Sequence, residues 1–304
     1  DGFADVIVGA QLHDGNGPDS GMVEVLSGLD GAVLHSWVGD GADDHFRIFS
    51  PEGELLDTWG EHGTGDGQFD FGGVGDIAFA SDGTFYVADT ANRRVQQFAP
   101  DRTFVRAWSD VGNWSGPLAS PTTANVLSRP NVVSVAPDGS VYVTDDMRNV
   151  VEHYTADGLW LNTLGAAGGQ ERLNFPGGVA FDQDGNTWVA DYGRNRLAIF
   201  APDGAYLGEV TGILMPSDLY FDDAGRLVVA DSKGLQVMNE DLQPVGRLWR
   251  NQGAYAFVPS AAPGPGDRVY AVDYNLGFLT AFQLRNPLPD PPADATPLRI
   301  TPAS

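Results

Sequence analysis

The sequence contains no cysteine, only one lysine (Lys233), and no apolar run of the roughly 18 residues that a membrane-spanning helix needs. The first absence excludes disulfides, thiol catalysis and cysteine-bound metals. Positive charge is scarce as well, because 17 Lys and Arg residues face 41 Asp and Glu residues, for a formal net charge of −24. A chain this acidic repels phosphate backbones and anionic lipids. We therefore expect no nucleic-acid partner and no membrane insertion.

The chain is rich in core-forming and turn-forming residues instead. Of its 304 residues, 42% are hydrophobic and 11% aromatic, which is enough to bury a sizeable core. The 39 glycines and 20 prolines are spread along the chain and suit many short strands. The excess of aspartate has two readings, genome composition with solubility or adaptation to salt, and both stay open. We expect a monomer, and favour an extracellular or periplasmic location.

One phrase of the sequence recurs five times as a short apolar run that ends in aspartate. The steps between these aspartates are 56, 46, 40 and 42 residues, and the five are Asp89, Asp145, Asp191, Asp231 and Asp273. A period near forty residues is typical of a four-stranded propeller blade. Asp-Gly and Pro-Asp-Gly turns separate the apolar runs, as in hairpins, and helical periodicity is almost absent. The sequence therefore predicts an all-β propeller.

The number of strands predicts six blades. Four blades of four strands are expected over 76–108, 131–164, 177–210 and 217–249, and three further strands over 254–284. The five N-terminal strands are expected at 5–10, 22–27, 32–37, 46–50 and 55–59. In the simplest closure, 22–59 form blade one and 5–10 become the outer strand of the last blade, which removes a free sheet edge. We expect one propeller domain over 1–285 and an extended proline-rich tail over 286–304.

Two repeat families share motifs with the chain. Gly67-Gln68-Phe69, Val87-Ala88-Asp89 and Asn92-Arg93 resemble the NHL repeat, and the likeness extends over 46–285. Residues 1–45 resemble an FG-GAP repeat of the integrin-α type, with Gly39-Asp40-Gly41 leading to Phe46. The NHL resemblance implies a propeller, a fold that serves binding modules, lyases and sensors. Of the FG-GAP calcium loop only Asp1 and Asp5 remain, so we expect that calcium site to be absent.

The repeat separates structural from functional candidates. The five recurring aspartates are predicted to accept backbone N–H bonds as turn caps, because a carboxylate present in every blade is a poor catalytic candidate. Other carboxylates break the pattern at the start of the channel-lining strand, namely Asp76 in blade two, Asp218 in blade five and, with the closure above, Glu24 in blade one. Asn131 lies one position earlier in blade three. Blades two and five are opposite in a six-bladed ring.

Oxygen ligands that converge on a channel favour a hard cation. The predicted metal ligands are Glu24, Asp76, Asn131 and Asp218, with Ca²⁺ as the expected ion and Mg²⁺ as the alternative. The other reading is that each carboxylate caps its strand or faces channel water. The arrangement is similar to the calcium-dependent six-bladed hydrolases of the gluconolactonase, paraoxonase and organophosphatase group. That resemblance implies a metal that polarises a carbonyl or phosphoryl oxygen.

The histidines offer one candidate base. His62 lies in a long loop on the predicted site face, so we predict Asp76, Asp218 and His62 as catalytic residues, with His45 as the runner-up base. No HExxH or Gly-x-Ser-x-Gly motif is present. Two functions stay open: a metal-dependent hydrolase of a small ester, lactone or phosphoester at the channel mouth, and a non-catalytic propeller that binds a ligand or protein.

Overall fold

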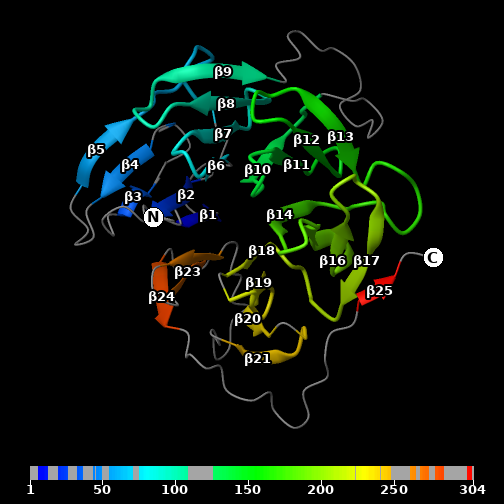
Figure 1. The fold of residues 1–304 in the computed structure, drawn as a ribbon. Coiled ribbons are helices and arrows are strands. Elements are labelled where there is room, and N and C mark those ends of the chain that lie inside the picture. Colours follow the sequence, from blue (N-terminus) through cyan, green and yellow to red (C-terminus); the bar gives the residue numbers. More distant parts are fainter. Residues whose placement is uncertain are drawn as a thin grey trace.

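The protein folds into six antiparallel β-sheets arranged around a central axis (Figure 1). The computed structural model describes residues 6–12, 20–26, 33–36, 44, 46–49, 55–70, 75–108, 126–222, 224–239, 241–247, 261–264, 268–273, 278–283 and 300–302. Within these ranges one 3₁₀ turn, Tyr192–Arg194, is the only helical element, and no helix is long and apolar enough to cross a membrane. The predicted all-β propeller is confirmed.

Each sheet is built from strands that follow one another in the chain. The first contains β1 (Val6–Leu12), β2 (Ser20–Leu26), β3 (Val33–Ser36), β4 (Phe46–Phe49) and β5 (Leu55–Trp59). The second contains β6 (Gly75–Phe79), β7 (Phe85–Asp89), β8 (Arg94–Phe98) and β9 (Phe104–Trp108). The third contains β10 (Pro130–Val135), β11 (Val141–Asp145), β12 (Val150–Tyr154) and β13 (Trp160–Leu164).

The other three sheets complete the ring. The fourth contains β14 (Pro176–Phe181), β15 (Thr187–Asp191), β16 (Arg196–Phe200), β17 (Tyr206–Thr211) and the C-terminal β25 (Ile300–Pro302). The fifth contains β18 (Asp218–Phe221), β19 (Leu227–Asp231), β20 (Gly234–Met238) and β21 (Pro244–Arg247). The sixth contains β22 (Ala261–Gly264), β23 (Arg268–Asp273) and β24 (Phe278–Gln283).

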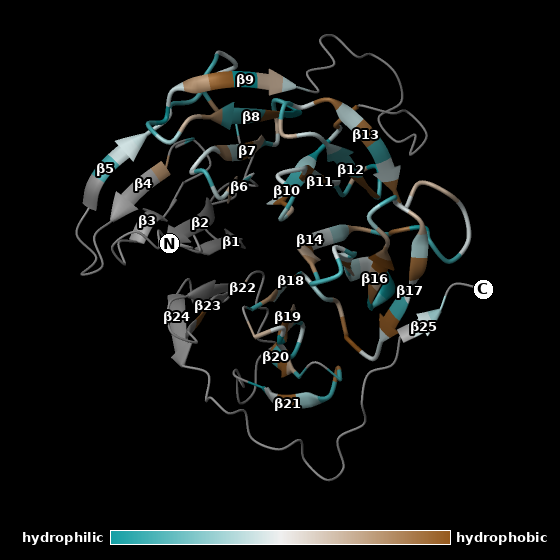
Figure 2. Cartoon of the chain, viewed as in Figure 1, coloured by the Kyte–Doolittle hydropathy of each residue, from teal (hydrophilic) through white to brown (hydrophobic). Residues whose placement is uncertain are grey.

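The predicted closure of the ring is wrong. The N-terminal strand β1 pairs with β2 from Val6↔Leu26 to Leu12↔Ser20 and stays in the first sheet, so it does not become the outer strand of the last blade. It is the innermost strand of its sheet and lies next to β22 of the last blade (Figure 2). A hairpin closed by the short segment 13–19 loses far less chain entropy than pairing with a strand more than 200 residues away, which explains this choice.

The proline-rich tail contributes one short strand. β25 pairs antiparallel with β17 at the outer edge of blade four, from Val210↔Ile300 to Gly208↔Pro302. Gly208 makes this approach feasible, because a Cβ at that position would lie 2.2 Å from the Thr301 carbonyl oxygen. The tail thus covers a sheet edge that would otherwise expose unpaired backbone groups.

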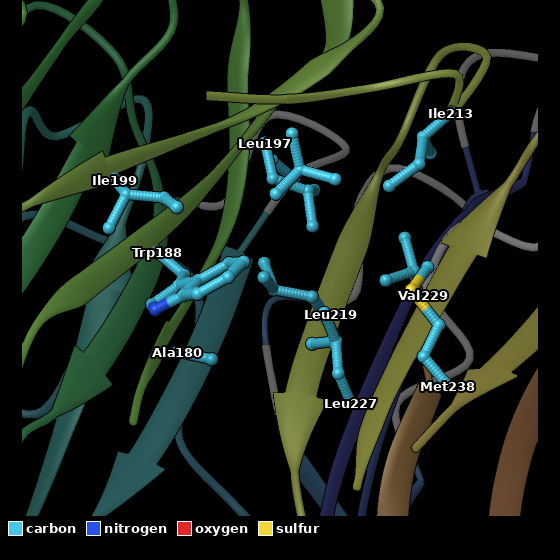
Figure 3. Close-up of a cluster of buried hydrophobic side chains, with 11 residues drawn as sticks. Ala180, Trp188, Leu197, Ile199, Ile213, Leu219, Leu227, Val229 and Met238 are labelled. Atoms are coloured by element: carbon cyan, nitrogen blue, oxygen red, sulfur yellow. The ribbon is translucent and has the colours of Figure 1, made fainter. Parts of the chain in front are cut away.

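The hydrophobic core lies between neighbouring blades. Figure 3 shows Trp188, Leu197 and Ile199 of blade four facing Leu219, Val229 and Met238 of blade five, and all six side chains are buried. Between blades one and two, aromatic rings fill the gap; the Phe98 centroid lies 4.8 Å from that of Trp59 and 5.2 Å from that of Phe85. Brown and teal bands follow one another along outer strands such as β9 and β17 in Figure 2, because alternate residues face opposite sides of a sheet. These interfaces fix the inner strands around the axis.

Candidate functional site

Three of the recurring aspartates, Asp89, Asp145 and Asp191, hold the loops that connect the blades, whereas Asp231 caps the turn after its own strand by accepting the Lys233 N–H. Asp89 accepts the Asp70 N–H (2.8 Å) and binds Arg94 Nε (2.7 Å). In blade four, Asp191 accepts the Asn174 N–H (2.7 Å) and binds Arg196 Nε (2.6 Å). Burial raises the pKa of Asp89 and of Asp191, and the N–H donors and arginines oppose that rise. These carboxylates are structural locks between an inter-blade loop and the strands that follow it.

Asp76 and Asp218 occupy the equivalent place on opposite inner strands. Asp76 lies at the start of β6, where its Oδ2 accepts the Val133 N–H of β10 at 2.9 Å. Asp218 begins β18; its Oδ1 accepts the Leu219 N–H at 2.9 Å and its Oδ2 accepts the Ala261 N–H of β22 at 3.1 Å. Each carboxylate therefore connects its own inner strand to that of the next blade. This part of the strand-cap reading is correct, and it holds both carboxylates between neighbouring inner strands.

The two carboxylates interact with each other. Burial raises the pKa of Asp76 to about 8, the Val133 and Ile77 N–H groups oppose the rise, and the negative charge of Asp218 adds to it. No arginine or lysine is among the groups that shift this pKa. A carboxyl group at the axis thus carries a proton near neutral pH unless a positive charge replaces it.

A glycine on β14 makes room for Asp218. A Cβ at Gly178 would lie 2.0 Å from Asp218 Oδ1 and 2.9 Å from Asp218 Cα. The preceding residue is equally constrained, since a Cβ at Gly177 would lie 2.2 Å from the Ser217 carbonyl oxygen. Any side chain at either position would push β18 away from β14, so the location of Asp218 depends on glycine in the neighbouring blade.

Of the other two predicted ligands, Asn131 lies on an inner strand and Glu24 does not. Glu24 is on β2, where it pairs with Val8 and Ser36, so it is one strand away from the innermost strand of its sheet. This corrects the prediction that it starts a channel strand, and the error follows from the wrong closure. Asn131 is on β10, and its Nδ2 lies 3.5 Å from Asp146 Oδ2. Asp146 is itself bound by Arg129, whose Nε is 2.7 Å from its Oδ1.

His62 belongs to a separate group of ligand atoms on the loop that leads into β6. Its Nδ1 lies 2.5 Å from Asp44 Oδ2, and atoms of His62, Asp44 and Asp70 all lie within 4.8 Å of one another. The His62 side chain is 63% exposed and that of Asp44 is 6% exposed. The hydrogen bond to Asp44 raises the pKa of His62, and the charges of Asp44 and Asp70 raise it further. The runner-up, His45, lies outside the described residues.

This loop is fixed by side chains from β8. Arg94 donates to the carbonyl oxygens of Thr64 (3.0 Å) and Gly65 (2.8 Å), and Gln96 donates to that of Gln68 (2.7 Å). Asp44 and Asp70 are not among the predicted site residues, although both contact or face His62. A signal was available for both, because Asp44 directly precedes the His45-Phe46 motif and Asp70 directly follows Gly67-Gln68-Phe69. Neither motif reveals that the two aspartates meet at one histidine.

A comparison with protein-family profiles assigns the chain to a family. The profile of the SMP-30/gluconolactonase/LRE-like region matches residues 73–233, slightly more than half of the sequence. The chain belongs to this family. The NHL and FG-GAP resemblances of its repeats stay predictions. No curated protein matches the sequence closely enough to count as a relative.

Solved structures share the fold at low sequence identity. A gluconolactonase from Xanthomonas campestris superposes with a TM-score of 0.56 at 16% identity, over 88% of this chain and 94% of that one. A putative gluconolactonase gives 0.57 at 16% identity, over 98% and 94%. A catalytically inactive virginiamycin B lyase from Staphylococcus aureus gives 0.59 at 11% identity, over 92% and 96%. At these identities the likeness shows the propeller fold.

Proposed function

We propose that this protein is a divalent-metal-dependent hydrolase that opens a small lactone at the loop end of its channel. The observation that carries the proposal is the pair of carboxylates, Asp76 and Asp218, on opposite inner strands of a member of the SMP-30/gluconolactonase/LRE-like family. The gluconolactonase structures that share the fold support the substrate class. Simple esters and phosphoesters are the next substrates to test, because the same charge distribution suits them.

The donor atoms at the axis fit a hard cation. Asp76 and Asp218 supply carboxylate oxygens, and their mutual repulsion favours an ion of opposite charge. Asn131 directs its Nδ2 toward Asp146, which leaves its Oδ1 as the amide atom available to an ion. We propose Asp76, Asp218 and Asn131 as ligands and Ca²⁺ as the ion, with Glu24 as a predicted fourth ligand whose side chain is outside the described residues. When bound, such an ion supplies charge that polarises the lactone carbonyl.

The chain's own residues then have distinct tasks. Asp76 and Asp218 are held in place by N–H groups of the next inner strand. Their oxygens therefore keep their positions when the carboxyl groups gain or lose a proton. We propose His62 as the base, because its bond to Asp44 fixes the ring through Nδ1 and leaves Nε2 to accept a proton. The loop of His62 leads into β6, so it reaches the same end of blade two as Asp76.

The reaction balances with these groups. Water adds its oxygen to the lactone carbonyl carbon and passes one proton to His62 Nε2. The ring C–O bond then breaks, and the alkoxide oxygen that leaves takes this proton back. The product is an open hydroxy acid, and His62 returns to its neutral form. Asp44 stabilises the positive charge on His62 between the two steps.

The test measures metal binding and hydrolysis in one set of variants. After treatment with chelator and dialysis, Ca²⁺ affinity and lactone hydrolysis are measured for the wild type, Asp76→Asn, Asp218→Asn and His62→Gln. We expect each Asn variant to lose at least about tenfold in Ca²⁺ affinity, together with its activity. His62→Gln should keep Ca²⁺ affinity and lose about 10²–10⁴-fold in kcat.

A matched control makes the same chemical change away from the axis. Asp203→Asn lies in the turn between β16 and β17, where the aspartate caps the Ala205 N–H at 3.0 Å. We expect wild-type Ca²⁺ affinity and activity from it. Hydrolysis that survives both Asp76→Asn and Asp218→Asn, or that is indifferent to chelator, would contradict the proposal.

A further inference from the structure

A hollow lies toward the end of the channel opposite to Asp76 and Asp218. It is a cavity of about 430 Å³, within the range of small-molecule sites, and it is bounded by the last residues of β6, β10, β14 and β18 and by the turns that follow β6 and β10. Asp76 is the second residue of β6 and Asp218 the first of β18, whereas Phe79 and Phe221 end these strands. The two levels are three residue steps apart, roughly 10 Å along the channel. The cavity also reaches Leu219, which directly follows Asp218, so its aromatic end is the part that is separate from the proposed metal site.

Aromatic side chains line this cavity. Phe79, Phe181 and Phe221 end three of its strands, and Val135 ends the fourth. The rings are fixed from behind, since the Phe181 centroid lies 4.9 Å from that of Tyr142 and the Phe221 centroid lies 5.4 Å from that of Trp188. Rings with limited freedom lose little entropy when a ligand binds.

Tyr220 lines the cavity, but its hydroxyl is closed off from it. The residue is only 8% exposed and packs between blades five and six, in the cluster of Val228, Val245 and Ala261, and its buried hydroxyl forms no hydrogen bond among the described residues. The hydroxyl of Ser134, another lining residue, is already engaged, because its Oγ donates to the Val179 carbonyl oxygen at 3.1 Å. Neither hydroxyl is therefore available to a ligand, and the cavity offers it a mainly apolar wall.

Carboxylates surround the same end of the channel. Each of the four strands runs directly into a turn with an aspartate, and the four are Asp82, Asp138, Asp182 and Asp222. Backbone N–H groups of the turns fix them; Asp82 and Asp138, for example, accept those of Thr84 and Ser140 at 2.9 Å. Among the described residues, Asp222 is the only one of the four with an ion-pair partner, Arg226. The rim is therefore negative, in a chain of net charge −24.

We propose that this cavity binds a small organic cation with an apolar body, of the aryl- or alkylammonium class. The aromatic walls accept the apolar body and attract its charge through their π-electrons. The aspartates of the rim favour a cation over a neutral or anionic molecule of the same shape.

The test compares three probes of one shape, measured by titration calorimetry at neutral pH. Benzylammonium should bind about fivefold or more tighter than benzyl alcohol, and benzoate should bind more weakly still. Methylammonium, which has the charge without the ring, should bind at least about fivefold more weakly than benzylammonium. Equal affinity for the three aromatic probes, or no binding of benzylammonium at about 10 mM, would overturn the proposal.

Two variants locate the binding. Asp138→Asn should weaken benzylammonium about threefold, whereas Asp203→Asn, in the same Ala-Pro-Asp-Gly sequence on the outer side of blade four, should not. Tyr220→Phe should leave the affinity for the probe unchanged, because the hydroxyl is closed off from the cavity, and the melting temperature of the free protein should stay level or rise, since the lost hydroxyl had no partner. Equal losses of benzylammonium affinity in Asp138→Asn and Asp203→Asn would mean that only the net charge of the protein matters, and would overturn the proposal. Asp218→Asn should leave this binding unchanged, which separates it from the metal site.

Discussion

Two sets of aspartates, one buried and one half-buried, lie on neighbouring strands of this propeller and differ in how their charge is compensated. Asp89 ends β7 opposite Gly75, the first residue of β6, and Asp76 is the next residue of β6. Asp89 meets an arginine, an asparagine and a glutamine as well as a backbone N–H group. Asp76 accepts backbone N–H groups and faces the negative charge of Asp218.

This difference in charge compensation distinguishes aspartates with a structural role from aspartates that can bind a ligand. A carboxylate whose partners all belong to the protein has no capacity left for a ligand, and removing it leaves those partners unsatisfied. A carboxylate that the protein holds in place without a neighbouring cation carries an uncompensated negative charge, which a bound metal ion can neutralise. The comparison predicts that variants of the first kind lose stability and variants of the second kind lose metal.

The largest effect is expected from Asp89→Ala. This change leaves buried Arg94 without its charge partner and frees the Asp70 N–H, so we expect a loss of about 3–5 kcal/mol in the free energy of unfolding. Denaturant titration measures it. The control Asp101→Ala, in an exposed turn, should cost less than about 1 kcal/mol. A change in Asp89→Ala below about 1 kcal/mol would contradict the locking role.

Much of this comparison could be predicted from the sequence, because the repeat supplies an internal alignment. The recurrence of Asp89, Asp145 and Asp191 predicted structural caps, and all three accept N–H groups from the loop before their blade. The departures at Asp76 and Asp218 predicted positions at the start of inner strands, which the structure confirms. Periodicity carries this information because each blade repeats one hydrogen-bonding scheme.

What the sequence could not predict depends on pairing between distant segments. Strand counting allowed β1 to join either end of the ring, and the wrong choice moved Glu24 by one strand. The His62–Asp44 contact joins residues 18 positions apart through side chains, and no repeat position marks it. The cavity at Tyr220 is formed by four blades together, so no single motif encodes it.

The pH dependence of stability should separate the two kinds of aspartate further. In chelator, the folded protein keeps a proton on Asp76 up to a pKa of about 8, whereas the unfolded chain releases it near pH 4. Folding therefore binds a proton across this window, so the contribution of Asp76 to stability is fully present below about pH 4 and is lost as the pH rises toward 8. We expect Asp76→Asn to remove on the order of 2–4 kcal/mol of this decline, measured as the difference from wild type.

Calcium should reverse that decline in the wild type. Above about pH 7, excess Ca²⁺ replaces the proton and raises the melting temperature of the wild type, but not that of Asp76→Asn. The control is Asp203→Asn, which should follow the wild-type curve with and without the ion. Parallel curves for wild type and Asp76→Asn from about pH 4 to 8 would show that Asp76 ionises normally.

The smallest effect on stability is expected from Gly178→Ala, because Gly178 of blade four leaves the space that the Asp218 carboxylate of blade five occupies. Gly178→Ala places a methyl group 2.0 Å from Asp218 Oδ1, so β18 must shift, at a cost of about 1–3 kcal/mol. The same shift should weaken Ca²⁺ binding about tenfold, since ligand atoms must stay within a few tenths of an ångström of their places. Calorimetry with Ca²⁺ and thermal unfolding measure the two effects separately. Gly168→Ala, where a Cβ would meet nothing within 4 Å, should change neither. A Gly178→Ala protein that is destabilised yet binds Ca²⁺ like the wild type would show that Asp218 belongs with the structural aspartates.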